Sequence, residues 1–151
     1  LLINARAETI AEKPAFRKAC RERRCLIPAT GFYEWTKTKE GALLPWYIHR
    51  AGSDHLAFAG IWQDWTSPEG ATLSTCAVVT TEANGPMSHI NHRMPVTIEP
   101  ANYGLWLGEI GKGAAGLMKP ASNEALLFHR VDPRVNSNRP DDPDLILPFD
   151  A

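Results

Sequence analysis

An aromatic segment of the sequence contains a carboxylate that could take part in proton transfer. Glu34 lies between Tyr33 and Trp35, and strand alternation would place Glu34 on the same face as Phe32. If that face is desolvated, the pKa of the carboxyl group rises, and the group can act as a general acid or base near neutral pH. A solvated surface charge is the alternative that the residue pattern leaves open.

Two further polar strings could bind an anionic substrate. Asn4 and Arg6 alternate onto one face of a short strand, where an amide and a guanidinium suit phosphate or sugar contacts, although a simple surface pair fits equally well. Asn91, His92 and Arg93 follow one another in a segment flanked by prolines, which predicts a loop. Because such a string is costly to bury without a role, it predicts a polar active-site loop.

Metal binding is a competing interpretation of some of these residues. His89 and His92 are three residues apart and could bind zinc together with Glu34 if the segment were helical. The prolines around them argue against a helix. Cys20 and Cys25 fit no common zinc module and are expected to be two buried thiols. We therefore expect no metal and no cofactor.

The chemistry-bearing residues must be positioned by a series of short strands. The expected elements are a helix over 8–24, a helix over 100–107, an irregular tail over 136–149, and strands over 25–28, 31–35, 46–49, 56–62, 76–80 and 126–131. The resulting class is α+β and β-rich, an antiparallel sheet or partial barrel with a few short helices. The glycine motif at Gly111, Gly113 and Gly116 lacks the preceding strand of a dinucleotide site and is expected to be a connection.

Length and composition narrow the possible partners. The 151 residues suit one domain spanning 1–151, and 44% apolar content allows a real core. No apolar run approaches the roughly 20 residues needed to span a membrane. Three cysteines favour a reducing compartment, hence the cytoplasm. Ten of the sixteen Lys and Arg residues lie in residues 1–50, which predicts a patch for polyanions unless they form a solvated helix face.

Four phrases follow one another along the chain: Asn4-Ala-Arg-Ala-Glu8, Gly31-Phe-Tyr-Glu-Trp35, His92-Arg-Met-Pro95 and Val135-Asn136-Ser137. In this order they resemble the SRAP family, the SOS-response-associated peptidases that process abasic sites in DNA. The resemblance implies a covalent crosslink between an N-terminal cysteine and the ring-opened aldehyde of an abasic site in single-stranded DNA, together with self-processing peptidase activity. The expected partner is single-stranded DNA with abasic sites, with no membrane and no obligatory protein partner inferred, and the expected location is the nucleoid in the cytoplasm.

The family cysteine has no counterpart among these residues. The domain is therefore expected to be N-terminally incomplete, and residues 1–151 alone are expected to form no covalent adduct. Cys20, Cys25 and Cys76 cannot replace the family cysteine, because none carries a free α-amine. The competing functions are a non-reactive module that binds single-stranded DNA and, less favoured, a metal-dependent hydrolase.

The resemblance also implies roles for individual residues. The catalytic group would comprise Asn4, which positions the sugar, Glu34 as acid or base, and Asn91 or His92. Asn91 stands where the family has a histidine, and His92 follows one residue later, so either could fill that role. The DNA-binding residues implied are Arg6, Trp35, Thr80 and Arg93.

Overall fold

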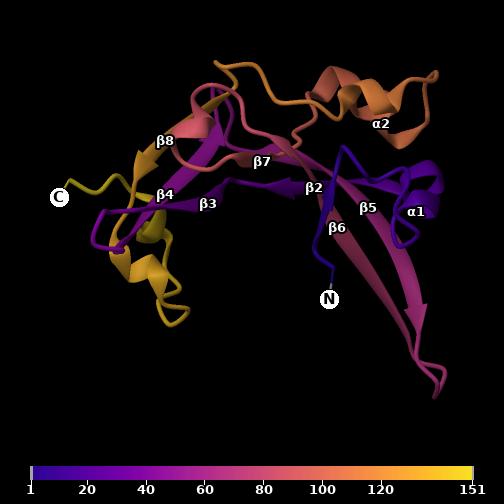
Figure 1. Cartoon of the computed structure of the whole chain (residues 1–151), viewed down its shortest axis with the longest axis horizontal. Helices are drawn as coiled ribbons and strands as arrows, with labels where there is room; N and C mark the ends of the chain where they lie inside the picture. The colour runs from indigo at the N-terminus through magenta and orange to yellow at the C-terminus, as the bar shows by residue number, and fades with distance from the viewer. Residues whose placement is uncertain (1, 151) are drawn as a thin grey trace.

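The computed structural model describes residues 2–150 and arranges them as two β-sheets with short helices and turns around them (Figure 1). The larger sheet contains β1 (Asn4–Arg6), β6 (Thr72–Glu82), β5 (Leu56–Thr66) and β2 (Arg24–Ala29) in that order, and β7 (Arg93–Pro95) also pairs with β6. The smaller sheet has the order β3 (Phe32–Lys37), β4 (Leu43–Arg50), β8 (Leu126–Arg130). The α-helices are α1 (Arg17–Glu22) and α2 (Tyr103–Leu107), and 3-10 turns cover Met87–His89, Pro100–Asn102, Ala114–Leu117, Pro133–Asn136 and Pro143–Ile146. The β-rich α+β class predicted from the sequence is thus confirmed.

One strand pair departs from the antiparallel pattern. β1 runs parallel to β6, with Ala5 opposite Val79 and Arg6 opposite Thr80. Ala5 is fully buried, whereas Asn4 and Arg6 are exposed, as strand alternation predicts. The pairing places the polar face of β1 beside Thr80.

The helix expected over 8–24 is much shorter than predicted. Only Arg17–Glu22 forms α1, and residues 7–16 form successive turns. Pro14 has no backbone N–H and restricts the residue before it, so a helix that continued through this point would be broken or kinked. Phe16 and Cys20 nevertheless pack against the same buried cluster, as their spacing predicts.

The loop expected around the Asn-His-Arg string is also partly wrong. Arg93–Pro95 forms β7, which pairs antiparallel with β6 so that Met94 faces Thr81. Met94 is buried in an apolar cluster that also contains Ile48 and Phe58. Burial of this side chain stabilises the extended conformation of the segment. The alternation then directs Arg93 away from that cluster.

Two clusters of buried apolar side chains pack against the sheets. One lies around Ala5, Val79 and Trp106, and the other contains Ile48 of the smaller sheet together with Phe58 of the larger. The second cluster therefore joins the two sheets. Within the described residues, no helix is long and apolar enough to cross a membrane.

Gly31, immediately before β3, is required by close packing. A Cβ atom at this position would overlap the Tyr47 ring and lie 2.5 Å from the carbonyl oxygen of Ile48. We expect Gly31→Ala to lower the free energy of unfolding by about 1–3 kcal/mol, the usual range for overpacking. Gly116→Ala is the matched control, because none of residues 2–150 outside its own turn places an atom within 4 Å of its Cβ position. Urea denaturation measures both variants, and equal stabilities would contradict this account of Gly31.

Candidate functional site

A groove of about 390 Å³ lies where the polar faces of β1, β6 and β7 meet β3 of the smaller sheet. Phe32, Phe58 and Met94 supply part of its apolar surface. Its full lining is Asn4, Phe32, Glu34, Phe58, Val78, Thr80, Asn91, Arg93, Met94 and Pro95. Residues from Asn4 to Pro95 thus contribute to one recess, and most of the site residues expected from the sequence line it.

Glu34 is half-buried in this groove on the same face of β3 as Phe32. Burial raises the pKa of its carboxyl group, while hydrogen bonds from Asn91 and from the Trp35 backbone oppose that rise. The Asn91 side chain donates from Nδ2 to Glu34 Oε2 at 2.9 Å. Burial is the largest cause, so this carboxyl group holds its proton to a higher pH than an ordinary glutamate.

Asn91 is itself fixed from its other end. Its Oδ1 accepts a hydrogen bond from the backbone N–H of Arg93 at 3.0 Å. The side chain therefore bridges the start of β7 and the carboxyl group on β3. This bridge connects the two sheets across the groove.

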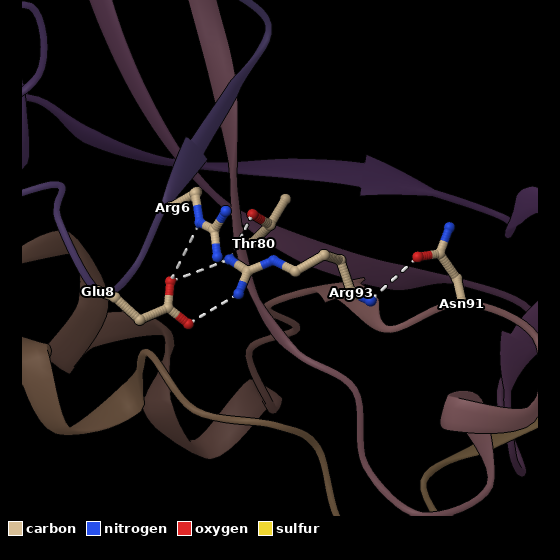
Figure 2. Close-up of polar contacts among 5 residues, drawn as sticks. All are labelled: Arg6, Glu8, Thr80, Asn91 and Arg93. Atoms are coloured by element: carbon tan, nitrogen blue, oxygen red, sulfur yellow. Dashed lines mark hydrogen bonds and ion pairs between the residues drawn. The ribbon is translucent and has the colours of Figure 1, made fainter.

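A cluster of polar and charged side chains stands at one wall of the site (Figure 2). Arg93 and Thr80 line the groove, whereas Arg6 and Glu8 contact each other beyond its lining. Arg93 donates two parallel hydrogen bonds to Glu8, at 2.8 Å and 3.0 Å, and a third to Thr80 Oγ1 at 3.0 Å. Arg6 Nε lies 3.8 Å from Glu8 Oε2. The hydrogen bond from Arg93 is the main reason that the pKa of Glu8 falls to about 2. The three charged residues together carry one net positive charge.

Glu8 is the functional candidate that sequence reasoning missed. It belongs to the phrase beginning at Asn4, but its contact with Arg93 crosses 85 residues of sequence. In the sequence, Glu8 stands two residues after Arg6, and this spacing could have predicted a local ion pair between them. The pairing of β7 with β6 brings Arg93 to it, and no local pattern encodes that pairing.

His92 does not reach the groove. It is exposed, and its neighbour Asn91 lines the recess instead. His92 lies in a bend immediately before β7 rather than in the strand itself. Of the two candidates for the family histidine position, the structure therefore brings only Asn91 to Glu34.

Trp35 is also not brought into the groove. It lies on the other face of β3 from Glu34, and its Nε1 donates to Asn136 Oδ1 at 2.7 Å. Asn136 in turn donates to the carbonyl oxygen of Leu43. These hydrogen bonds attach the C-terminal tail to the smaller sheet. They also bring the phrase that ends at Trp35 into contact with the phrase that contains Asn136.

The metal-site interpretation is wrong for the residues it named. His89 and His92 are both exposed, and neither lines the groove with Glu34. Among residues 2–150, no three His, Cys, Asp or Glu side chains gather in a way that could hold a metal ion. Cys20 and Cys25 are half-buried thiols whose pKa values are raised by burial.

Comparison with known proteins defines the class. The family model for SOS response associated peptidase (SRAP) matches residues 1–138, so the chain belongs to the SRAP family. A crystal structure of a protein from Bacteroides thetaiotaomicron superposes with a TM-score of 0.89 at 30% identity, covering 97% of this chain and 65% of that one.

Two named relatives are informative. Abasic site processing protein YoqW of Bacillus subtilis is 38% identical over 148 residues, which cover 96% of this chain and 66% of YoqW. Abasic site processing protein HMCES of Rattus norvegicus is 30% identical, with 97% of this chain and 50% of HMCES covered. The chain thus spans just under two thirds of the length of YoqW and half of the length of HMCES.

The hydrogen bond between Asn91 and Glu34 makes the titration of the groove testable. Asn91→Leu removes the donor that opposes the effect of burial, so the pKa of Glu34 should rise further than in the wild-type chain. Side-chain ¹³C NMR across pH 3–9 measures this value. Asn138→Leu, at an exposed position outside the groove, is the control. An unchanged Glu34 pKa in Asn91→Leu would show that the hydrogen bond from Asn91 does not stabilise the carboxylate form of Glu34.

The raised pKa also predicts a pH dependence of stability. The folded chain binds the Glu34 proton more tightly than the unfolded chain, whose pKa is about 4.3. Stability should therefore fall as pH rises from that value through the higher folded pKa. Glu34→Gln has no charge to bury and should lack this loss, so its stability relative to wild type should increase over the window. Urea midpoints at several pH values test the sign.

Proposed function

We propose that this chain provides the substrate groove of a domain that processes abasic sites in single-stranded DNA. The observation that carries the proposal is that a half-buried carboxyl group, on Glu34, and the guanidinium of Arg93 line the same recess. An abasic nucleotide offers matching chemistry, a sugar without a base flanked by phosphates. Membership of a family whose relatives YoqW and HMCES are named abasic site processing proteins supports this choice. The domain would act on chromosomal DNA at the nucleoid, in the cytoplasm.

Glu34 would move the proton that the sugar chemistry requires. When an amine attacks the ring-opened aldehyde, a Schiff base forms and the former carbonyl oxygen leaves as water, which needs a proton donor. A carboxyl group with a raised pKa keeps a protonated fraction nearer neutral pH and can supply that proton. Asn91 would hold the carboxyl in place, and Asn4 lines the same groove from β1. The attacking cysteine, its crosslink and the self-processing peptidase activity come to this proposal from the family resemblance.

Arg93, Thr80 and Arg6 would hold the phosphates on either side of the sugar. Arg93 presents a planar fork that suits a phosphate, and Thr80 adds a hydroxyl donor. In the free protein, Glu8 occupies two of the guanidinium hydrogens. A phosphate must therefore compete with Glu8, which would hold back loose binding to DNA.

A non-reactive DNA-binding module is the second candidate, favoured by one observation. Asn91 reaches Glu34 where the family resemblance expects a histidine, and an amide cannot deliver a proton near pH 7. A denaturing gel separates the two functions in a protein that carries this chain behind an N-terminal cysteine. An adduct with abasic single-stranded DNA supports processing, whereas anisotropy binding without an adduct supports the module.

The groove predicts salt-dependent binding that favours single strands. Fluorescence anisotropy should show tighter binding to a single-stranded oligonucleotide with a tetrahydrofuran abasic analogue than to its duplex. The log of affinity should fall with log salt by roughly 0.7 per phosphate contact. Arg93→Ala should weaken binding and reduce that slope, while Arg139→Ala, exposed in the tail, should not. Salt-insensitive binding or a preference for the duplex would overturn the proposal.

Glu8→Gln should strengthen the binding of DNA, the opposite of the effect expected for Arg93→Ala. The substitution removes the negative charge that occupies Arg93 and lies near Arg6, so both cations become available to phosphate. We expect tighter binding to single-stranded DNA with and without the abasic analogue, and a steeper salt slope. Anisotropy titrations at several salt concentrations measure both quantities. Weaker binding would show instead that Glu8 is needed to hold Arg93 in its binding position.

A further inference from the structure

The ends of β5 and β6 form a hairpin that extends past the rest of the molecule (Figure 1). The pairing of β1 with β6 reaches no further than Asn4 opposite Val78, and that of β2 with β5 ends at Arg24 opposite Ile61. Trp62 still exchanges hydrogen bonds with Arg23, so the hairpin is a two-stranded ribbon from Gln63 onward. Such a ribbon is marginal by itself, and its exposed face is available for a partner.

One face of this ribbon continues the face that is buried in the body. The first pair on it, Ile61 and Ala77, is buried in the core. The next is the polar pair Gln63 and Thr75, and the last is Trp65 opposite Leu73. These two residues are 55% and 57% exposed. A large aromatic and an aliphatic residue thus stand in solvent at the far end of one continuous surface.

Recesses connect this surface with the groove that contains Glu34. A cavity of about 330 Å³ shares Asn4 with the groove and is lined by Arg6 and Lys13, with no acidic residue in its lining. A small cleft next to that cavity shares Leu2 and Phe16 with it. The cleft is also lined by Gln63 and Thr75, the pair immediately before the exposed end of the ribbon.

We propose that this track binds the nucleotides that flank the abasic site in the same DNA strand, with an unpaired base stacked on Trp65. The order of chemistry along the track fits a single strand: cations for phosphates at Arg6 and Lys13, polar groups at Gln63 and Thr75, and an aromatic platform at the end. Proteins that bind single strands without sequence preference combine a cationic path with aromatic stacking platforms in this way. The proposal rests on the function proposed above, since it extends the path of the same substrate.

The test compares oligonucleotides of two lengths by anisotropy. The short one contains a central tetrahydrofuran abasic analogue with few flanking nucleotides. The long ones add about eight nucleotides on the 5′ or the 3′ side, within the site sizes of single-strand binders. The wild-type chain should bind one of the long forms more tightly than the short form. Trp65→Ala should lose about 5-fold or more of that gain, the size expected for one stacked base.

Two further variants separate stacking from damage to the hairpin. Trp65→Phe keeps an aromatic face and should keep most of the gain. Thr66→Ala changes the next residue, which points to the opposite face of the ribbon, and should keep all of it. Binding of the short oligonucleotide should be the same in every variant, because it reaches only the groove.

The outcomes distinguish this proposal from the function on which it rests. Failure of the wild-type chain to bind the short oligonucleotide would count against the groove. Normal short binding with no length gain, or with an equal gain in Trp65→Ala, would overturn the track alone. Self-association by sedimentation that disappears in Trp65→Ala would assign the exposed pair to a second copy of this chain and would also overturn it.

Discussion

β6 hydrogen-bonds to β1, β5 and β7, and the position of almost every polar group in the groove follows from those pairings. The parallel register with β1 sets Arg6 opposite Thr80. The antiparallel register with β7 sets Thr80 opposite Pro95 and Arg93 two residues further along. A shift of one residue in either register would turn these side chains toward the core. The buried residues between them, Ala5 and Met94, make such a shift costly because they would be replaced by charges.

The position of Glu34 depends on contact between the two sheets. Phe32 packs edge-on against Phe58 with ring centroids 5.7 Å apart, and this pair joins β3 to β5 inside the second apolar cluster. The same packing that desolvates Glu34 holds it within reach of Asn91. Burial and the amide hydrogen bond act on the carboxyl pKa in opposite directions. The amide therefore keeps the carboxylate attainable in a place where burial alone would favour the neutral acid.

Much of the architecture could be predicted from local pattern. The aromatic and β-branched runs gave the strands, and alternation correctly placed Glu34 with Phe32 and Asn4 with Arg6. The helix over 8–24 was overextended because the spacing of Phe16 and Cys20 satisfies a single turn as well as a long helix. β7 was missed because a strand of three residues has no period to detect, and its stability comes from pairing with β6.

The groove itself was less accessible to sequence reasoning, because its key contacts are non-local. The Arg93–Glu8 ion pair joins residues 85 positions apart, and it gives the wall a charge balance that neither phrase reveals alone. A bare guanidinium would attract any phosphate, whereas one already paired with a carboxylate of pKa about 2 remains neutralised throughout the physiological range. Under the proposed function, a phosphate could replace both hydrogen bonds from Arg93 to Glu8 at once, which a single neutral acceptor could not do. The wall is thus suited to discriminate by geometry as well as by charge, and the residue responsible, Glu8, is held in position by the turn that follows β1.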